Sequence, residues 1–345
     1  MLDLSVPFWA DIAIFLGATT VIGFAGTKLA GHADRLADRT GIGEALTGTF
    51  VLGFITALPG LTASVTAAIQ QNPALAFGNA IGGIGFQTTI LALADLAHRE
   101  ANLEHAAASV ENMLQTIMLI LLMTLVLLGL SGPNLTIAHV HPVTLLLVPS
   151  AGLAFLLTWR VRERPMWRPR QTRETISDLP RPESSGQSTA LLVGGMISTA
   201  VLTLSGGVLV AEAAGNIVDE TRLSEAVVGT LFMGVATSVP ELVTCLAAVR
   251  RRALTLAVAD IIGGNFFDVL FVAAADLAFF SGSLYHGRGV GSREVFVLSF
   301  TLLLNVLFLA GSLGRQKHGP ANIGLESVAM LIVYVGGALT LAFAM

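Results

Sequence analysis

Apolar runs about as long as a membrane-spanning helix recur ten times along this chain of 345 residues. A helix needs about 20 mostly apolar residues to cross roughly 30 Å of hydrocarbon. The approximate limits of the runs are 8–29, 44–69, 74–97, 110–130, 143–160, 190–212, 225–249, 254–280, 294–313 and 322–344. Because β-barrel strands would alternate polar and apolar residues over about ten positions, the sequence predicts an all-α polytopic protein with ten transmembrane helices in a lipid bilayer. Only 12% of the residues are charged, about half the fraction usual in soluble domains.

The basic residues fall mainly on one side of this predicted topology. With ten spans, the loops after spans 1, 3, 5, 7 and 9 share one side and hold 16 of the 19 Lys and Arg residues. The opposite side holds only Arg222, Arg288 and Arg293. Since basic loops are retained in the cytoplasm, we expect both termini to face away from it, in a prokaryotic inner or plasma membrane.

The two halves of the chain repeat one another. A shift of 181 residues places residues 44–97 over 225–278 without a gap and with 20 identities. Chance similarity between apolar helices does not explain why glycines, both prolines and an aspartate all stay in register. Each half has five spans, so the second half must enter the membrane from the opposite side. Inverted repeats of this kind are typical of secondary transporters, whose substrate lies between the repeats near the midplane.

The duplication divides the chain into three predicted parts. Residues 1–160 form the first five-helix repeat and residues 190–345 form the second. The segment 161–189 between them is rich in Arg and Pro, and we interpret it as a cytoplasmic linker. A lipid-contacting basic patch is the alternative for this segment.

A proline lies near the middle of the second span of each repeat, at Pro59 and Pro240. Proline lacks an N–H and displaces the carbonyl four residues earlier. Within a membrane, unpaired carbonyls are tolerated where they line a cavity or coordinate a cation. An ordinary kink is the alternative for either proline alone, but the matched pair favours two broken helices at an ion site. The residues that we expect to place oxygens on these two turns are Gly53, Thr56, Gly234, Thr237 and Ser238.

Two carboxylates are predicted near the membrane centre, Glu241 directly after Pro240 and Asp268 midway along the next span. An acidic side chain at that depth costs at least about 2.5 kcal/mol, so its default interpretation is functional. Oxygen ligands of this kind suit Na⁺, Ca²⁺ or H⁺ rather than a soft metal. Asp260 lies eight residues before Asp268, roughly 12 Å along a helix. It either lines an access path or is a solvated carboxylate at a helix end. Asp95 and Asp276 are expected at the membrane interfaces.

The segment from Gly229 to Asp268 resembles the α-repeat of the calcium/cation antiporter superfamily, which includes the sodium/calcium exchangers and their proton-coupled relatives. The family motifs are Thr-Ser-x-Pro-Glu and Gly-Ser-Asn-x-x-Asn/Asp. The resemblance implies a transporter rather than an enzyme, with inorganic cations as substrates and with no cofactor or nucleic-acid partner. It also implies an ion site whose positions in this chain are Thr237, Ser238, Glu241, Asn265, Asp268 and, in the first repeat, Gln87.

The first repeat departs from that pattern. Ala57 replaces the motif Ser, Gly60 replaces the acidic ligand, and Gly83 and Gly264 replace the Ser of the second motif. The two remaining carboxylates would carry a charge of −2, which one Ca²⁺, two Na⁺ or two H⁺ would neutralise. Exchange of Ca²⁺ against Na⁺ or H⁺ is therefore the leading hypothesis. Because Ca²⁺ takes six to eight oxygens, a monovalent cation/proton antiporter is the first alternative. A degenerate member that does not transport is the second.

Overall fold

The computed structural model describes residues 8–40, 53–98, 101–163, 166–170, 172, 188–221, 223–250, 252–319 and 323–344. Helices account for nearly all of this described part, and no strand is present in it beyond one isolated bridge between Ile137 and Val140. The helices are α1 (Phe8–Thr40), α3 (Gly53–Thr56), α4 (Leu58–Ile69), α5 (Pro73–Ala97), α6 (Leu103–Ala106), α7 (Val110–Ser131), α8 (Pro142–Glu163), α9 (Thr189–Thr221), α10 (Glu225–Val227), η2 (Val228–Met233), α11 (Gly234–Thr237), α12 (Val239–Arg250), α13 (Leu254–Ala278), η3 (Leu284–His286), α14 (Ser292–Gly314) and α15 (Leu325–Phe343).

The chain is an integral membrane protein, as its composition predicts. Among the described residues, eight helices are long and apolar enough to cross a bilayer, and a ninth span is formed if the pair Glu225–Thr237 and Val239–Arg250 is taken together. The predicted span 44–69 corresponds to α3 and α4, while residues 44–52 of it lie outside the described part.

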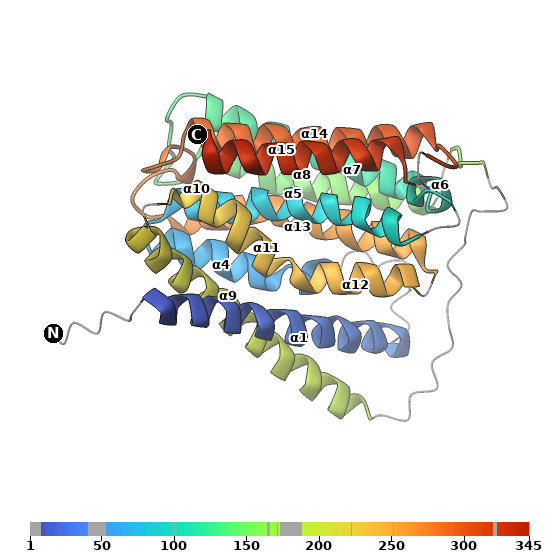
Figure 1. Cartoon of the computed structure of the whole chain (residues 1–345), viewed down its shortest axis with the longest axis horizontal. Helices are drawn as coiled ribbons and strands as arrows, with labels where there is room; N and C mark the ends of the chain where they lie inside the picture. Colours follow the sequence, from blue (N-terminus) through green and yellow to red (C-terminus); the bar gives the residue numbers. More distant parts are fainter. Residues whose placement is uncertain are drawn as a thin grey trace.

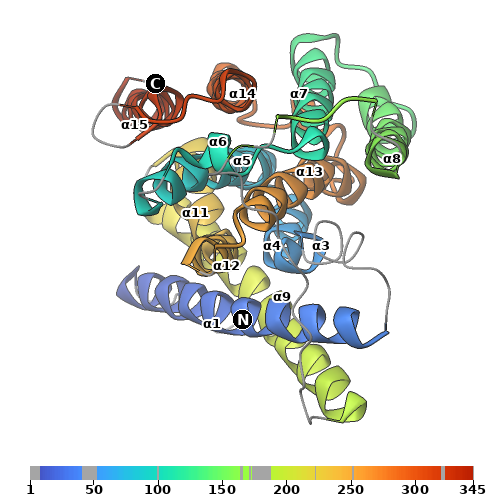
Figure 2. The same cartoon turned by 90° about the vertical axis from the view of Figure 1, so that its right-hand side faces the viewer.

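Two helices form the centre of the molecule. Burial covers 78% of the apolar window in α5 and 83% in α13, more than in any other candidate span among the described residues. Figure 2 shows α14, α15, α7 and α8 on one side of this central pair, and α1 and α9 on the other. Because α5 and α13 face protein on nearly all sides, they are apolar all round, and their polar residues lie inside the protein.

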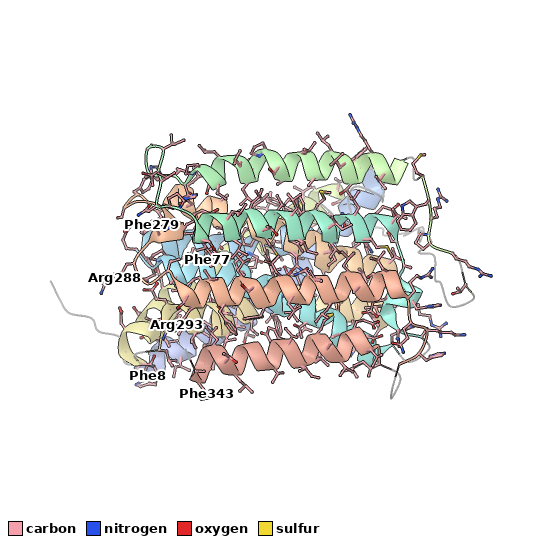
Figure 3. All side chains as sticks on the ribbon, turned by 90° about the horizontal axis from the view of Figure 1, so that it is seen from above. Phe8, Phe77, Phe279, Arg288, Arg293 and Phe343 are labelled. Atoms are coloured by element: carbon pink, nitrogen blue, oxygen red, sulfur yellow. The ribbon has the colours of Figure 1, made fainter. Side chains whose placement is uncertain are left out.

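The central helices run in opposite directions. A side chain at Gly287, which follows α13, would meet Pro73 at the start of α5. Phe77 near the start of α5 and Phe279 directly after α13 lie toward the same end of the molecule (Figure 3). The chain termini lie at that end as well (Figure 1). Equivalent helices of the duplicated segments are thus antiparallel.

Equivalent aspartates connect the elements at the two ends of this central pair. Asp95 accepts hydrogen bonds from the backbone N–H of Leu103 at 2.7 Å and of Gly324 at 2.8 Å. Asp276, 181 residues later, accepts them from Leu284 at 2.7 Å and from His141 at 2.9 Å. Both aspartates are fully buried. They lie at span ends as expected, and each joins the start of a short helix to the start of the last helix of a repeat.

Gly82 lies where α5 crosses the π-helix η2, and we expect Gly82→Ala to destabilise the protein. A Cβ at position 82 would lie 2.5 Å from the Cα of Thr230 and 2.8 Å from its carbonyl oxygen, so the backbones would have to separate. Overpacking of this kind costs about 1–3 kcal/mol. Gly17→Ala on α1 is the control, because its Cβ would meet nothing within 4 Å. Thermal unfolding in detergent should show a lower midpoint for Gly82→Ala only, and equal midpoints would contradict the close crossing.

Candidate functional site

Both proline positions coincide with interrupted helices. In the second repeat, α11 ends at Thr237 and α12 begins at Val239, and the segments on either side of this break are bent by 46°. In the first repeat, α3 ends at Thr56 and α4 begins at Leu58. Because proline has no N–H, the carbonyls of the residues four positions earlier lose their helical partners. The prediction of two broken helices is therefore confirmed, and the breaks are 181 residues apart.

A cavity of about 10 Å³ lies beside these breaks. That volume suffices for about one water-sized particle, which is also the size of a dehydrated small cation. Side chains from both repeats line it, and Lys and Arg are absent from the lining. The lining residues are Ala57, Gly60, Asn79, Gly83, Gln87, Thr237, Glu241, Asp268 and Phe271.

The two carboxylates predicted near the membrane centre meet at this cavity. Glu241 is 1% exposed, and neither of its carboxylate oxygens has a hydrogen-bond partner. The Thr56 hydroxyl lies near this carboxylate but donates to the Gly53 carbonyl at 3.2 Å. Asp268 is also buried, and its Oδ1 has no partner. Buried carboxylate oxygens without donors are costly to leave unsatisfied, and a bound cation or a proton would satisfy them.

Gln87 contributes its amide nitrogen to the site rather than its oxygen. The Nε2 atom donates to Asp268 Oδ2 at 2.6 Å and to Ser238 Oγ at 3.1 Å. The opposite amide orientation would place its oxygen against the carboxylate of Asp268, two acceptors together unless Asp268 is protonated. An N–H donor therefore occupies the place that a cation would need between these two oxygens. Gln87 Oε1 is buried without a partner.

Asn79 is a site residue that the motifs do not reveal. It donates to the Gly60 carbonyl at 3.0 Å and to Ser64 Oγ at 2.8 Å, and it accepts a hydrogen bond from Thr237 Oγ at 3.1 Å. Asn79 thus holds the broken helix of the second repeat against the first. The available signal was its register, because Asn79 lies 181 residues before Asp260.

Asp260 is not the solvated carboxylate at a helix end that the sequence allowed. Its side chain is buried and accepts a hydrogen bond from Thr244 at 2.7 Å. Asp260 is absent from the cavity lining, so it lies apart from Glu241 and Asp268, as its spacing along the helix predicts.

Three other predicted positions lie beside the cavity rather than in its lining. Asn265 is fully buried and donates to Thr88 Oγ at 3.0 Å. A Cβ at Gly53 would lie 3.0 Å from the backbone of Gly263. A Cβ at Gly234 would lie 2.7 Å from the backbone nitrogen of Gly83. These glycines allow backbones to approach closely, which brings Ser238 and Thr237 to the site.

An aromatic ring fills the space at Gly60, the position where the family motif has its acidic ligand. A Cβ added to Gly60 would lie 2.9 Å from Cε2 of Phe271, and this ring also lines the cavity. The first repeat therefore lacks the carboxylate and also the room for one. The asymmetry between the repeats is built into the packing of the site.

Comparisons with known proteins agree with this architecture. The chain matches the family described as "Sodium/calcium exchanger protein" over residues 10–161 and again over 190–343. It is 25% identical over 329 residues to the putative antiporter CaxA of Alkalimonas amylolytica, a match that covers 95% of this chain and 97% of that protein. It is 24% identical over 327 residues to the inner membrane protein YrbG of Escherichia coli, covering 94% and 95% of the two chains.

Solved structures show the same fold. The sodium-calcium exchanger NCX_Mj superimposes with a TM-score of 0.63 at 16% sequence identity, covering 98% of this chain and 100% of that one. The H⁺/Ca²⁺ exchanger CAX superimposes with a TM-score of 0.63 at 13% identity, covering 97% of this chain and 88% of that one.

Proposed function

Because the chain belongs to the sodium/calcium exchanger family, we propose that it is a secondary antiporter that exchanges Ca²⁺ against Na⁺ or H⁺ by alternating access. The observation that carries this proposal is the cavity at the two broken helices, which brings together the unsatisfied carboxylates of Glu241 and Asp268. Cation exchange is the activity of this transporter family, which is not a family of enzymes.

The proposed architecture has ten spans in two inverted repeats, residues 1–160 and 190–345, joined by the linker 161–189. Its support is the 181-residue register, the antiparallel central helices and the paired aspartates at their ends. We further propose that both termini face away from the cytoplasm, because the basic loops lie opposite to them. Alternating access would then expose Glu241 and Asp268 to one side at a time.

Charge balance supports competition between the exchanged ions for one site. With both Glu241 and Asp268 ionised, the cavity carries −2. One Ca²⁺ neutralises this charge, and so do two Na⁺ or two H⁺. A net charge left within the membrane is costly, so we expect the site to change sides only when it is loaded with one of these sets.

A monovalent cation/proton antiporter is the second candidate, and the ligand inventory favours it. The cavity has three carboxylate oxygens without partners, two on Glu241 and one on Asp268. Ca²⁺ takes six to eight oxygens, usually with several carboxylates. The Gln87 amide occupies the remaining Asp268 oxygen, and Phe271 fills the place of another acidic ligand. These features lower the expected affinity for a divalent ion more than that for Na⁺ or K⁺.

Binding titrations with Ca²⁺, Na⁺ and K⁺ on the purified protein would separate the two candidates, and ion-driven flux in proteoliposomes would test transport itself. Saturable Ca²⁺ binding that Na⁺ or H⁺ displaces supports the first candidate. Binding of Na⁺ or K⁺ alone supports the second. Absence of flux with every cation would contradict both and favour a member of the family that does not transport.

Gln87→Glu is expected to increase divalent affinity. The substitution replaces the N–H donor by an oxygen of the same shape and adds a third carboxyl group. We expect Ca²⁺ to bind at least about tenfold tighter, a change of about 1.4 kcal/mol, and the gain should grow from pH 6 to pH 8 because the added carboxyl must ionise. Gln115→Glu is the matched control, since Gln115 is buried on α7 outside the cavity. An unchanged or weaker Ca²⁺ affinity in Gln87→Glu would show that the amide does not take the place of a cation.

A further inference from the structure

The two ends of the central helix pair have the same architecture but different chemistry. We name them the Asp276 corner, formed by η3 and the start of α8, and the Asp95 corner, formed by α6 and the start of α15. In the Asp276 corner the neighbouring groups are neutral. Thr144 Oγ donates to Asp276 at 2.7 Å and contacts the Tyr285 hydroxyl at 3.4 Å, and Ser283 Oγ accepts from the Tyr285 N–H at 3.2 Å. One carboxylate therefore suffices to hold this junction.

The Asp95 corner has the same backbone contacts but two additional carboxyl groups. In the 181-residue register, Asn102 corresponds to Ser283 and Glu104 corresponds to Tyr285. Glu104 is 2% exposed, and its Oε1 accepts from Ser327 Oγ at 3.4 Å while its Oε2 has no partner. Glu326 from α15 interacts directly with Glu104 and carries a second buried oxygen without a partner, Oε1.

Asn102 points into the same cluster. It is 1% exposed, and neither atom of its side-chain amide has a hydrogen-bond partner. A Cβ at Gly324 would lie 3.3 Å from Asn102 Nδ2 and 2.5 Å from Glu326 Oε1, so these two side chains lie next to one another. The corner thus holds two carboxyl groups and an amide with unsatisfied buried atoms, although the opposite corner shows that the fold does not require them.

The basic groups nearby form their hydrogen bonds elsewhere. His105 contacts the Arg315 carbonyl at 2.9 Å and Thr172 Oγ at 3.1 Å through its two ring nitrogens. The Arg315 guanidinium donates to the carbonyls of Arg170 at 2.7 Å and His105 at 3.0 Å. The Lys317 side chain is exposed, and its carbonyl accepts from Asn102. The charges that act on Glu104 are those of Asp95 and Glu326, both negative.

A proton fits this cluster better than a metal ion. Across the described ranges, no group of three or more His, Cys, Asp or Glu side chains is placed to hold a metal. Two adjacent carboxyl groups in a buried site share a proton because both cannot ionise at low cost. In agreement, burial raises the pKa of Glu104 well above its ordinary value, and the charges of Asp95 and Glu326 raise this pKa further.

We propose that Glu104 and Glu326 share a proton and form a pH-sensitive latch that holds the start of α15 against α5 and α6. Loss of this proton leaves two carboxylates beside Asp95, and their repulsion separates α15 from the corner. The helix α5 also carries Gln87, which lies eight residues before Asp95, roughly 12 Å along the helix. The latch therefore adjoins a helix of the ion site, and in the proposed orientation it senses cytoplasmic pH.

The sign of the pH effect follows from the raised pKa of Glu104. The closed latch binds the proton more tightly than the open one. Its stabilisation is complete below the ordinary Glu pKa of about 4.3. It then decreases about tenfold in the closing equilibrium for each pH unit and is lost once the pH passes the raised value. Rising pH therefore opens the latch.

Hydrogen exchange in nanodiscs between pH 5 and pH 9, corrected for the intrinsic exchange rate at each pH, tests this proposal without requiring transport. The N–H of Gly324 is bonded to Asp95, so peptides covering 323–330 should lose protection by up to about tenfold per pH unit. Peptides covering 140–147 of the Asp276 corner provide an internal control and should show no such loss.

Glu104→Gln should remove the pH dependence of peptides 323–330, because an amide keeps the hydrogen bond and cannot ionise. Glu111→Gln on α7 is the matched control, since Glu111 accepts from Ser109 outside the cluster, and it should leave the dependence unchanged. Equal pH dependence at the two corners, or its persistence in Glu104→Gln, would overturn the latch. Should Glu104→Gln not fold, Glu326→Gln and the comparison of the two corners in the unmodified protein decide the question.

Discussion

Glu241→Gln is expected to lower ion-driven cation exchange in proteoliposomes at least about a hundredfold. The substitution keeps the shape of the side chain but removes one of the two negative charges that line the cavity. A unit charge about 4 Å from a cation contributes about 4 kcal/mol at an effective dielectric constant of 20, and about 2.7 kcal/mol corresponds to a hundredfold. Asp268→Asn should have a comparable effect, because Asp268 supplies the other charge.

Two controls separate this effect from misfolding. Glu111→Gln makes the same chemical change on α7, away from the cavity, and should leave exchange unchanged. The unfolding temperature of Glu241→Gln without ions should not fall, because the carboxylate it replaces is buried without a hydrogen-bond partner. Normal exchange in both Glu241→Gln and Asp268→Asn would reject the site.

The broken helices and the two carboxylates were predictable because their signals are local or periodic. Pro59 and Pro240 interrupt helices through their own covalent structure, and the 181-residue register doubles that evidence. A carboxylate is costly in hydrocarbon, so Glu241 and Asp268 stand out within apolar runs. The family match over both halves and the antiparallel central helices agree with the predicted duplication. The count of ten spans stays a prediction, because residues 41–52 lie outside the described part.

Contacts between the repeats could not be predicted in this way. Sequence spacing places Gln87 on the same helix face as Gly83, but it does not tell whether the amide nitrogen or oxygen meets Asp268. The role of Phe271 depends on how α13 crosses α4, which only the packed structure determines. Asn79 and the burial of Asp260 are further cases, since both depend on partners from another helix.

The absence of an acidic side chain at position 60 leads to the second large effect. We expect the double variant Gly60→Glu/Phe271→Ala to bind Ca²⁺ at least about a hundredfold tighter than the unmodified protein, which corresponds to about 2.7 kcal/mol. Removing the ring opens the space that a Cβ at position 60 would share with it at 2.9 Å, and the new carboxylate gives the cavity a third negative charge. Isothermal titration calorimetry at constant pH would measure the change.

The matched control is Gly60→Gln/Phe271→Ala, which introduces the same shape without the charge. Gly60→Glu alone should lower the unfolding midpoint, because overpacking against the ring costs about 1–3 kcal/mol, and Phe271→Ala alone should lower it by leaving a cavity. The double variant should lose less stability than the sum of the two, since each change relieves the defect of the other. Equal Ca²⁺ affinity in the Glu and Gln double variants would show that the missing carboxylate does not limit divalent binding. A gain confined to the Glu variant would instead identify the pairing of Gly60 with Phe271 as the feature that reduces this exchanger to a site with two carboxylates.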